Sequence, residues 1–388
     1  MYSETDRWHV LYHAVSSRSP QCYNGARGFV SRSRPPRATD AARRDCLRNN
    51  SSGEHVGTSG RLGEGGATPT ESPNAGKRPS PLRDGPPLAI SIDLEDYFHV
   101  EALSGIVSRD AWPSYASRFE ENTKRALDLL ARYDTRATFF ILGWAAERAP
   151  RLMREIADAG HEIGCHSYWH RRIWTITLEE FREDTRRAVN ALEDATGEKP
   201  RGYRAPTFSI DHRSLWAIEI LAEEGFRYDS SVFPVQHDLY GMPSAPRAPF
   251  RWRSESGLTL LEVPMPTFRA MGRVWAFGGG GYLRILPFSF NRWAIRRASK
   301  QENIPVVVYF HPWEIDPGQP HLPVGLRSRL RHYTNLAGME ARLASLLQEN
   351  RFVTVRELID GWVAKAPIPE HQVSNHLLAQ EVCLCHVP

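Results

Sequence analysis

The sequence predicts an α/β fold in which a largely parallel sheet is covered by helices. Short apolar runs typical of buried strands alternate with segments of helical periodicity through residues 88–362. One run, 305–310, is rich in valine, as are strands covered on both faces. Several runs end in polar or charged clusters, which is typical of a (β/α) barrel with its chemistry at the C-terminal rim.

Six or seven strands are expected, separated by helices and loops. The expected strands are 88–92, 137–143, 161–166, 202–205, 258–263, 305–310 and 352–355. The expected helices are one that closes near 133, then 145–159, 178–195, 215–224, 289–302 and 335–348. The four glycines 278–281 are expected to form a mobile loop. A phosphate-binding loop is not expected, because no Lys-Ser/Thr follows them and no clear strand-to-helix turn surrounds them.

Residues 1–87 are expected to be a disordered basic segment. They contain 11 Ser, 9 Pro and 10 Gly, and they carry 13 basic against 8 acidic side chains. Residues 88–388 carry 36 basic and 37 acidic side chains, so no nucleic-acid partner is expected for them. One folded domain over 88–362 and an irregular tail over 363–388 complete the expected organisation.

Cysteine usage and hydropathy favour a cytoplasmic location. Five cysteines in 388 residues form no disulfide framework, and their odd number favours a reducing compartment. No apolar run approaches the ~20 residues of a membrane span. The first thirty residues show no continuous apolar core of a signal peptide. Stable membrane insertion is therefore not expected, and the oligomeric state is left open.

Two histidines four residues apart, His166 and His170, directly follow the third expected strand. If this segment is helical, both rings lie on one face and can bind one metal ion through nitrogen. Two histidines at this spacing also arise by chance, so the prediction depends on the other strand ends.

Three carboxylates, Asp93, Glu95 and Asp96, crowd the end of the first strand. Like charges in a partly buried site need a cation, a proton or an arginine to neutralise them. Strand alternation places Asp93 and Glu95 on one side and Asp96 on the other, unless the strand ends earlier. One carboxylate and two histidines would leave metal positions for water and substrate, and the other carboxylate could act as a base. The alternative is a solvated acidic loop or a helix cap.

Polar residues also end later strands. Arg204 could hold a carboxylate ionised, and His311 could donate a proton to a leaving amine near neutral pH. A surface ion pair and an ordinary polar strand end are the alternatives. Asp229 could tune a histidine or cap a turn.

Four motifs in this order resemble the polysaccharide deacetylases of the NodB homology type: ATFFILG, His166-Ser-x-x-His170, Arg204-Ala-Pro206 and Phe310-His311-Pro-Trp-Glu314. The resemblance covers about residues 88–360. The segments SIDLEDYFHVEAL, FHPWEIDPGQP and RHYTNLAG resemble, more narrowly, deacetylases of exosortase-linked exopolysaccharide clusters. The resemblance implies a distorted (β/α)7 barrel that removes N-acetyl groups from the amino sugars of a glycan substrate. It also implies one divalent ion, Zn²⁺ in the first place and Co²⁺ or Ni²⁺ otherwise.

The resemblance also implies roles for individual residues. Asp93 would be the general base, oriented by Arg204, and His311 the general acid. An acidic residue just after Asp93 would bind the metal with His166 and His170. The residues implied in oxyanion or substrate contacts are Pro206, Thr207 through its backbone N–H, Asp229 and Trp313. Aromatic residues that could stack on sugars, or simply pack, are Tyr97, Phe98, Trp169, Trp275 and Trp313.

Two positions depart from the family pattern. The usual Asp-Asp-Gly is here Asp93-Leu94-Glu95-Asp96-Tyr97. Glu95 is favoured as the metal ligand because alternation places it beside Asp93, and Asp96 is the second choice. Tyr309 stands where family members often have an aliphatic pocket residue, so the shape of the acetyl pocket is left open.

Three rival functions are considered. A cyclic amide or imide hydrolase on the same scaffold would dispense with the metal, which the two histidines argue against. A non-catalytic carbohydrate-binding relative would not need Asp93, Arg204 and His311. A nucleic-acid binder would use the basic segment 1–87, and its binding would depend steeply on salt.

Overall fold

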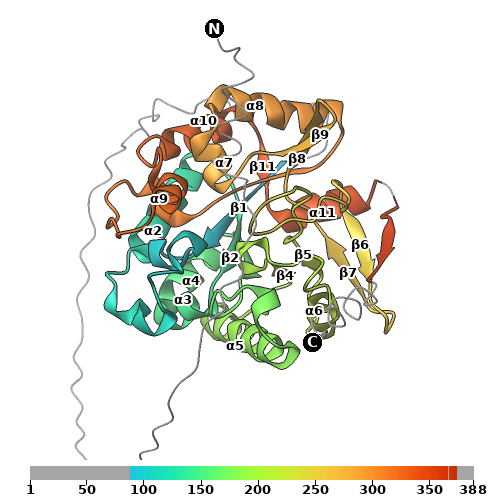
Figure 1. Cartoon of the computed structure of the whole chain (residues 1–388), viewed down its shortest axis with the longest axis horizontal. Coiled ribbons are helices and arrows are strands. Elements are labelled where there is room, and N and C mark those ends of the chain that lie inside the picture. Colours follow the sequence, from blue (N-terminus) through green and yellow to red (C-terminus); the bar gives the residue numbers. More distant parts are fainter. Residues whose placement is uncertain (1–87, 366, 374–388) are drawn as a thin grey trace, which may run out of the picture. The chain divides into compact units, whose positions relative to one another are not determined.

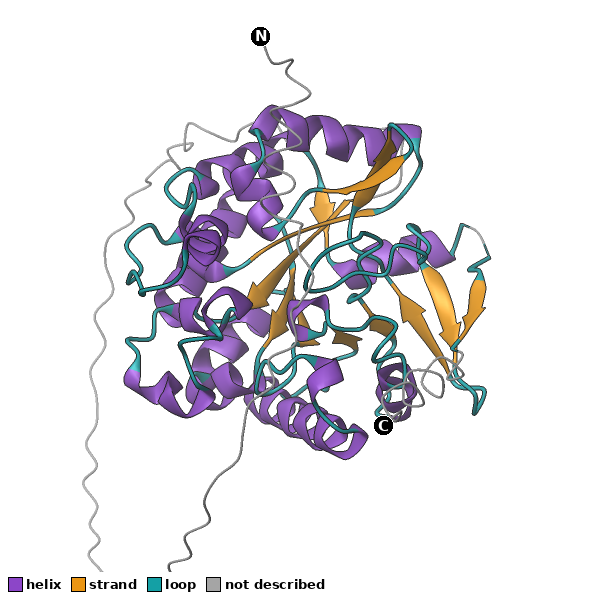
Figure 2. Cartoon of the chain, viewed as in Figure 1, coloured by secondary structure: helices purple, strands orange, loops and turns teal. Residues whose placement is uncertain are grey.

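The structure, a computed structural model, describes residues 88–365 and 367–373. The expected disordered segment 1–87 and most of the expected tail lie outside the described residues. Within the described part, the predicted α/β fold with a mostly parallel sheet is confirmed (Figures 1 and 2). No helix there combines the length and the apolar character that crossing a membrane requires.

Seven parallel strands form the centre of the sheet, in the order β10-β1-β2-β3-β4-β5-β7. Their bounds are β1 Leu88–Leu94, β2 Thr138–Ile141, β3 Glu162–Cys165, β4 Gly202–Tyr203, β5 Tyr228–Asp229, β7 Thr259–Glu262 and β10 Val306–Phe310. The parallel register, for example Ile92 with Phe310 and Cys165 with Tyr203, brings the carboxyl ends of the strands to one rim.

Three strands extend the sheet beyond these seven. β6 (Phe250–Arg253) pairs antiparallel with β7, and β12 (Glu370–Gln372) pairs with β6. The region expected as an irregular tail therefore contains a strand. β11 (Phe352–Val353) adds to β1. The separate hairpin of β8 (Thr267–Ala270) and β9 (Arg273–Ala276) was not expected from the sequence.

Helices connect the strands. Their bounds are α2 Phe119–Arg132, α3 Gly143–Arg148, α4 Pro150–Asp158, α5 Leu178–Thr196, α6 Ala217–Glu223, α7 Gly280–Ile285, α8 Phe288–Arg296, α9 Leu326–Tyr333, α10 Met339–Glu349 and α11 Val355–Val363. The single helix expected over 145–159 is two helices. The reason is Pro150, which has no N–H to continue a helix and stands instead at the first position of α4.

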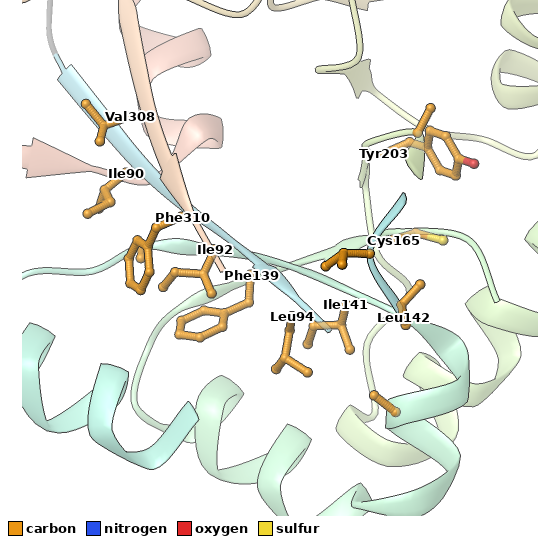
Figure 3. Close-up of a cluster of buried hydrophobic side chains, with 14 of the residues drawn as sticks. Ile90, Ile92, Leu94, Phe139, Ile141, Leu142, Cys165, Tyr203, Val308 and Phe310 are labelled. Atoms are coloured by element: carbon orange, nitrogen blue, oxygen red, sulfur yellow. The ribbon is translucent and has the colours of Figure 1, made fainter. Parts of the chain in front are cut away.

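Side-chain alternation along β1 separates the core from the site. Ile90, Ile92 and Leu94 point to one side, where they pack with apolar side chains of β2 and β10 (Figure 3). Ser91 and Asp93 therefore point to the other side of the strand, and both contact the guanidinium of Arg204. Burial of one face of β1 thus fixes which side its polar residues occupy.

The glycine segment 278–281 is not the loop expected from the sequence. The N–H of Tyr309 donates to the carbonyl of Gly278, and Gly279 forms a β-bridge with Tyr309. A Cβ at Gly279 would clash with the Tyr309 ring. Gly280 and Gly281 open helix α7. The expectation of a mobile loop was wrong: the glycines let the backbone approach a large ring closely.

Candidate active site

A cavity of about 190 Å³ lies at the C-terminal rim of the strands. The sequence-predicted residues that line it are Asp93, Glu95, His166, His170, Thr207, His311 and Trp313. These residues lie at or just after the carboxyl ends of β1, β3, β4 and β10, and the parallel sheet brings those strand ends together.

Glu95, His166 and His170 form the one group of side chains in the described residues whose ligand atoms could hold a metal ion, all within 4.8 Å of one another. Oε2 of Glu95 is buried and accepts no hydrogen bond of good geometry, yet it lies 2.9 Å from Nε2 of His170. With metal–ligand distances of ~2.0–2.2 Å, two ligands of one ion lie about 3 Å apart, so this separation is compatible with a shared cation. The donor set therefore fits a divalent ion, with two nitrogens and one carboxylate as in catalytic zinc sites.

The protonation of these ligands also suits a cation. Burial lowers the pKa of His166 to about 4, so its imidazole is neutral at pH 7. Its Nδ1 lies 2.8 Å from the carbonyl oxygen of Arg204 and donates to it, which leaves Nε2 as the lone-pair donor. Burial would raise the pKa of Glu95, but the nearby His170, His311 and His166 outweigh burial and hold it well below its usual range.

The two histidines come together for a different reason than the spacing suggested. The segment after β3 is not helical, and Ser167 and His170 have φ values of 66° and 50°, in the left-handed region. The backbone N–H groups of Tyr168 and Trp169 donate to the carboxylate of Asp184 on α5, at 2.7 and 3.2 Å. A strained loop anchored by Asp184 therefore positions His170, and the sequence contained no signal of it.

Asp96, the alternative ligand, is not brought to this group. Its carboxylate accepts hydrogen bonds from Tyr97 N, Ser117 Oγ, Arg118 N and Phe119 N, at 2.7–3.1 Å. It thereby caps the 3₁₀ turn Tyr97–His99 and the start of α2. Between the two choices left by the sequence, the geometry favours Glu95, and Asp96 takes the helix-cap alternative.

Asp93 is held by Arg204. Nη1 of Arg204 donates to Oδ1 of Asp93 at 2.7 Å and to Oγ of Ser91 at 2.8 Å. The remaining guanidinium nitrogens donate to the carbonyl and the hydroxyl of Ser230. Arg204 has no exposed surface, so solvent does not screen its charge. This charge neutralises the buried carboxylate of Asp93.

His311 faces the two carboxylates from β10. Its Nε2 lies 3.5 Å from Oε1 of Glu95 and 3.9 Å from Oδ2 of Asp93. Its Nδ1 lies 2.9 Å from Oε2 of Glu314. Burial lowers the pKa of His311, but the hydrogen bond and charge of Glu314, with Glu95 and Asp93, raise it to about 9.

The implied substrate residues fall at different places. Thr207 lines the cavity with φ 56°, a left-handed conformation that is strained for a β-branched residue, and Pro206 begins the turn that contains it. Trp313 is buried between His311 and His332, with ring centroids 5.1 and 4.4 Å away. Its ring therefore packs inside the wall of the site and is not exposed for a sugar to stack on.

Asp229 is not brought to the cavity. Oγ of Ser231 donates to it at 2.5 Å, and its carboxyl pairs with that of Glu262. Burial raises the pKa of Asp229 to about 6, and burial together with Asp229 raises that of Glu262. Two buried carboxyl groups stay together by sharing a proton. Asp229 therefore neither tunes a histidine nor contacts the cavity.

The other aromatic residues expected to stack on sugars lie in the core or outside this cavity. Tyr97 and Phe98 are buried in the core. Trp169 lines a separate cavity of about 630 Å³ beside His170. Nε1 of Trp275 donates to the carbonyl of Ala270 in the β8–β9 hairpin. Among the aromatic residues that line the cavity is Tyr309, whose ring lies 5.2 Å from that of Phe208.

Two residues beside His311, Glu314 and Arg284, were not expected from the sequence to have a role in the site. Glu314 pairs with His311, and Arg284 pairs with Glu314 at 2.5 Å. Glu314 stands three residues after His311, the spacing of a capping box, which could have indicated its contact. Arg284 comes from α7, and no local pattern marks it.

Two family descriptions match the chain. Residues 110–228 match the family described as polysaccharide deacetylase, and residues 230–360 match a domain of unknown function (DUF3473). The cavity is thus lined from both matched segments and from the first strand.

Curated relatives match over short segments. A peptidoglycan deacetylase from Helicobacter pylori is 34% identical over 113 residues, 29% of this chain and 38% of that protein. A peptidoglycan-N-acetylglucosamine deacetylase from Bacillus cereus is 35% identical over 100 residues, 26% of this chain and 36% of that protein. The chain therefore spans little more than a third of the length of these relatives.

A solved structure supports the fold. It is a crystal structure of a Mycobacterium smegmatis protein whose assignment as a polysaccharide deacetylase is itself inferred. It matches with a TM-score of 0.51 and 20% identity, over 77% of this chain and 98% of that one. This likeness shows the fold alone. The match of residues 110–228 agrees with the NodB-type motifs, so this part of the chain is similar to the polysaccharide deacetylase family.

Proposed function

We propose that the protein is a metal-dependent hydrolase that removes N-acetyl groups from amino sugars of a polysaccharide. The observation that carries the proposal is the convergence of Glu95, His166 and His170 between two proton-handling groups, Asp93 and His311. The exopolysaccharide as substrate rests on the resemblance of the sequence motifs. The cavity of about 190 Å³ is smaller than the ~300–1,000 Å³ of drug-sized pockets, so we expect it to take only a small part of a polysaccharide.

The chain's own residues would divide the work. A divalent ion held by Glu95, His166 and His170 supplies Lewis acidity, which acidifies water and polarises a carbonyl. Asp93 accepts a proton from the water that attacks the acetyl carbon. The C–N bond then breaks, and Nε2 of His311 gives the departing nitrogen its proton. The products are acetate and a free amine. Thr207 lines the cavity, and its backbone N–H would bind the oxyanion in this scheme.

Arg204 has an orienting role in this scheme. A base must be aimed to remove a proton from water, and the 2.7 Å contact with Arg204 orients the Asp93 carboxylate. Arg204 also stacks over Phe140, with 4.2 Å from its central carbon to the ring centroid. This restraint from several sides keeps Asp93 in one rotamer.

The test is acetate release by the full chain. The protein is stripped with a chelator, supplied with Zn²⁺, Co²⁺ or Ni²⁺, and incubated with N-acetylglucosamine oligomers. Acetate release is expected only with metal, and His166→Ala should lose both metal and activity. His161→Ala is the matched control, because His161 lies at the opposite end of β3, where its Nδ1 accepts from the N–H of Ala137. Metal-free hydrolysis of a cyclic imide, with no acetate from the oligomers, would favour the rival hydrolase.

A further inference from the structure

Glu314 is a buried carboxylate whose two oxygens contact His311 and Arg284. Oε2 of Glu314 accepts from the backbone N–H of His311 at 3.0 Å and from its Nδ1–H at 2.9 Å. Two bonds from one residue to one oxygen fix both the start of the loop after β10 and the angle of the His311 ring. The ring then presents Nε2, and not Nδ1, to Asp93 and Glu95.

Arg284 holds the other oxygen of Glu314. Its Nε donates to Oε1 of Glu314 at 2.5 Å. Its Nη1 donates to the carbonyls of His332 and Thr334, and its Nη2 to that of Arg331, at 2.7–3.0 Å. The side chain is 2% exposed. All three nitrogens of this planar guanidinium donate hydrogen bonds, which fixes its position in a way that a lysine could not reproduce.

We infer that Glu314 and Arg284 are positioning residues for the proton donor His311, which gives the segment of unknown function, residues 230–360, a direct part in the reaction. The inference rests on the proposed function. Arg284 ties α7 and the end of α9 to Glu314, and Glu314 ties them to His311. Contacts within residues 230–360 therefore orient the proton donor His311 toward the base Asp93 on β1.

The chemistry of the leaving group allows this role to be tested. An amine leaves only when its nitrogen is protonated, so amide hydrolysis needs a well-aimed His311. A nitrophenolate leaves from 4-nitrophenyl acetate without a proton. Attack by water still needs Asp93 and the metal in both cases. Loss of aim at His311 should therefore reduce amide hydrolysis and leave hydrolysis of the aryl ester nearly unchanged.

The experiment compares Glu314→Gln and Arg284→Lys with the wild type on both substrates. We expect kcat for deacetylation of the sugar oligomer to fall about 100-fold with KM little changed, and ester hydrolysis to stay within about threefold. The matched control is Arg342→Lys. Arg342 donates to the carbonyls of Leu283, Arg284 and Leu286, so it supports the same helix without contacting Glu314. Its variant should keep both activities.

Metal content and thermal unfolding are measured for each variant. Equal loss of both activities, or undiminished amide hydrolysis, in a folded and metallated Glu314→Gln protein would overturn the inference. If Arg284→Lys does not fold, Glu314→Gln against Arg342→Lys still decides. Failure of the proposed function looks different: the wild type itself would release no acetate from the oligomer, and the inference would fall with it.

Discussion

The neighbours Glu95 and Asp96 should give opposite results when substituted. Asp96 accepts four hydrogen bonds, three of them from the backbone N–H groups of Tyr97, Arg118 and Phe119. Asp96→Ala leaves these donors without the carboxylate. A lost N-cap costs about 0.5–2 kcal/mol and a buried unsatisfied donor about 1–3 kcal/mol. Since these terms overlap, we expect the free energy of unfolding to fall by about 2–4 kcal/mol.

For a domain of this size, that loss lowers Tm by roughly 5–15 °C, at about 2–4 °C per kcal/mol. Glu95→Gln should lose metal binding while the metal-free protein keeps its Tm, because the substitution removes a buried charge and few contacts. Melts are recorded with chelator, so that metal binding does not shift Tm, and metal content is measured by mass spectrometry. Metal loss in Asp96→Ala with an unchanged Tm would refute the reasoning.

Three further outcomes are expected. Asp93→Asn should lower kcat about 10²- to 10⁴-fold while metal content is retained, and equal metal loss would show that base and ligand are exchanged. The folded-state pKa of Asp229, about 6, lies above its usual 3.8, so its contribution to stability is present below pH 4 and is lost as pH rises through 6. Asp229→Asn should therefore flatten the fall in the free energy of unfolding over this window, and an identical pH profile would contradict the assignment. Gly279→Ala should destabilise the protein by about 1–3 kcal/mol through its clash with Tyr309, whereas Gly281→Ala, with its nearest neighbour 3.7 Å away, should not; denaturant unfolding compares them.

Sequence periodicity was sufficient for most of the central parallel strands and most helices, because burial on one or both faces dictates which positions are apolar. It failed where one residue overrides the pattern, as at Pro150, and where short antiparallel strands carry mixed polarity, as in the β8–β9 hairpin. Such strands are half-exposed, so their pattern resembles that of a loop.

The site could be predicted only in part for a similar reason. Residues at strand ends were visible as polar clusters, so the positions of Asp93, Glu95, His166, Arg204 and His311 at one rim agree with the sequence expectation. Contacts made across long separations carry no local signature. The side chain of Arg284 meets that of Glu314 thirty residues away, and only the folded chain shows it.

The order of strands has a practical consequence for dividing this protein. β1 lies between β2, from the first part of the chain, and β10, from the last. A chain cut near residue 229 would lose β10, which pairs with β1 from Leu88 to Ile92, and β11, which pairs with Leu88 and Ala89 at the other edge of β1. The backbone of β1 would then be open to pairing with other molecules. Neither residues 110–228 nor residues 230–360 can therefore be removed or exchanged alone, because both segments contribute strands to the same sheet.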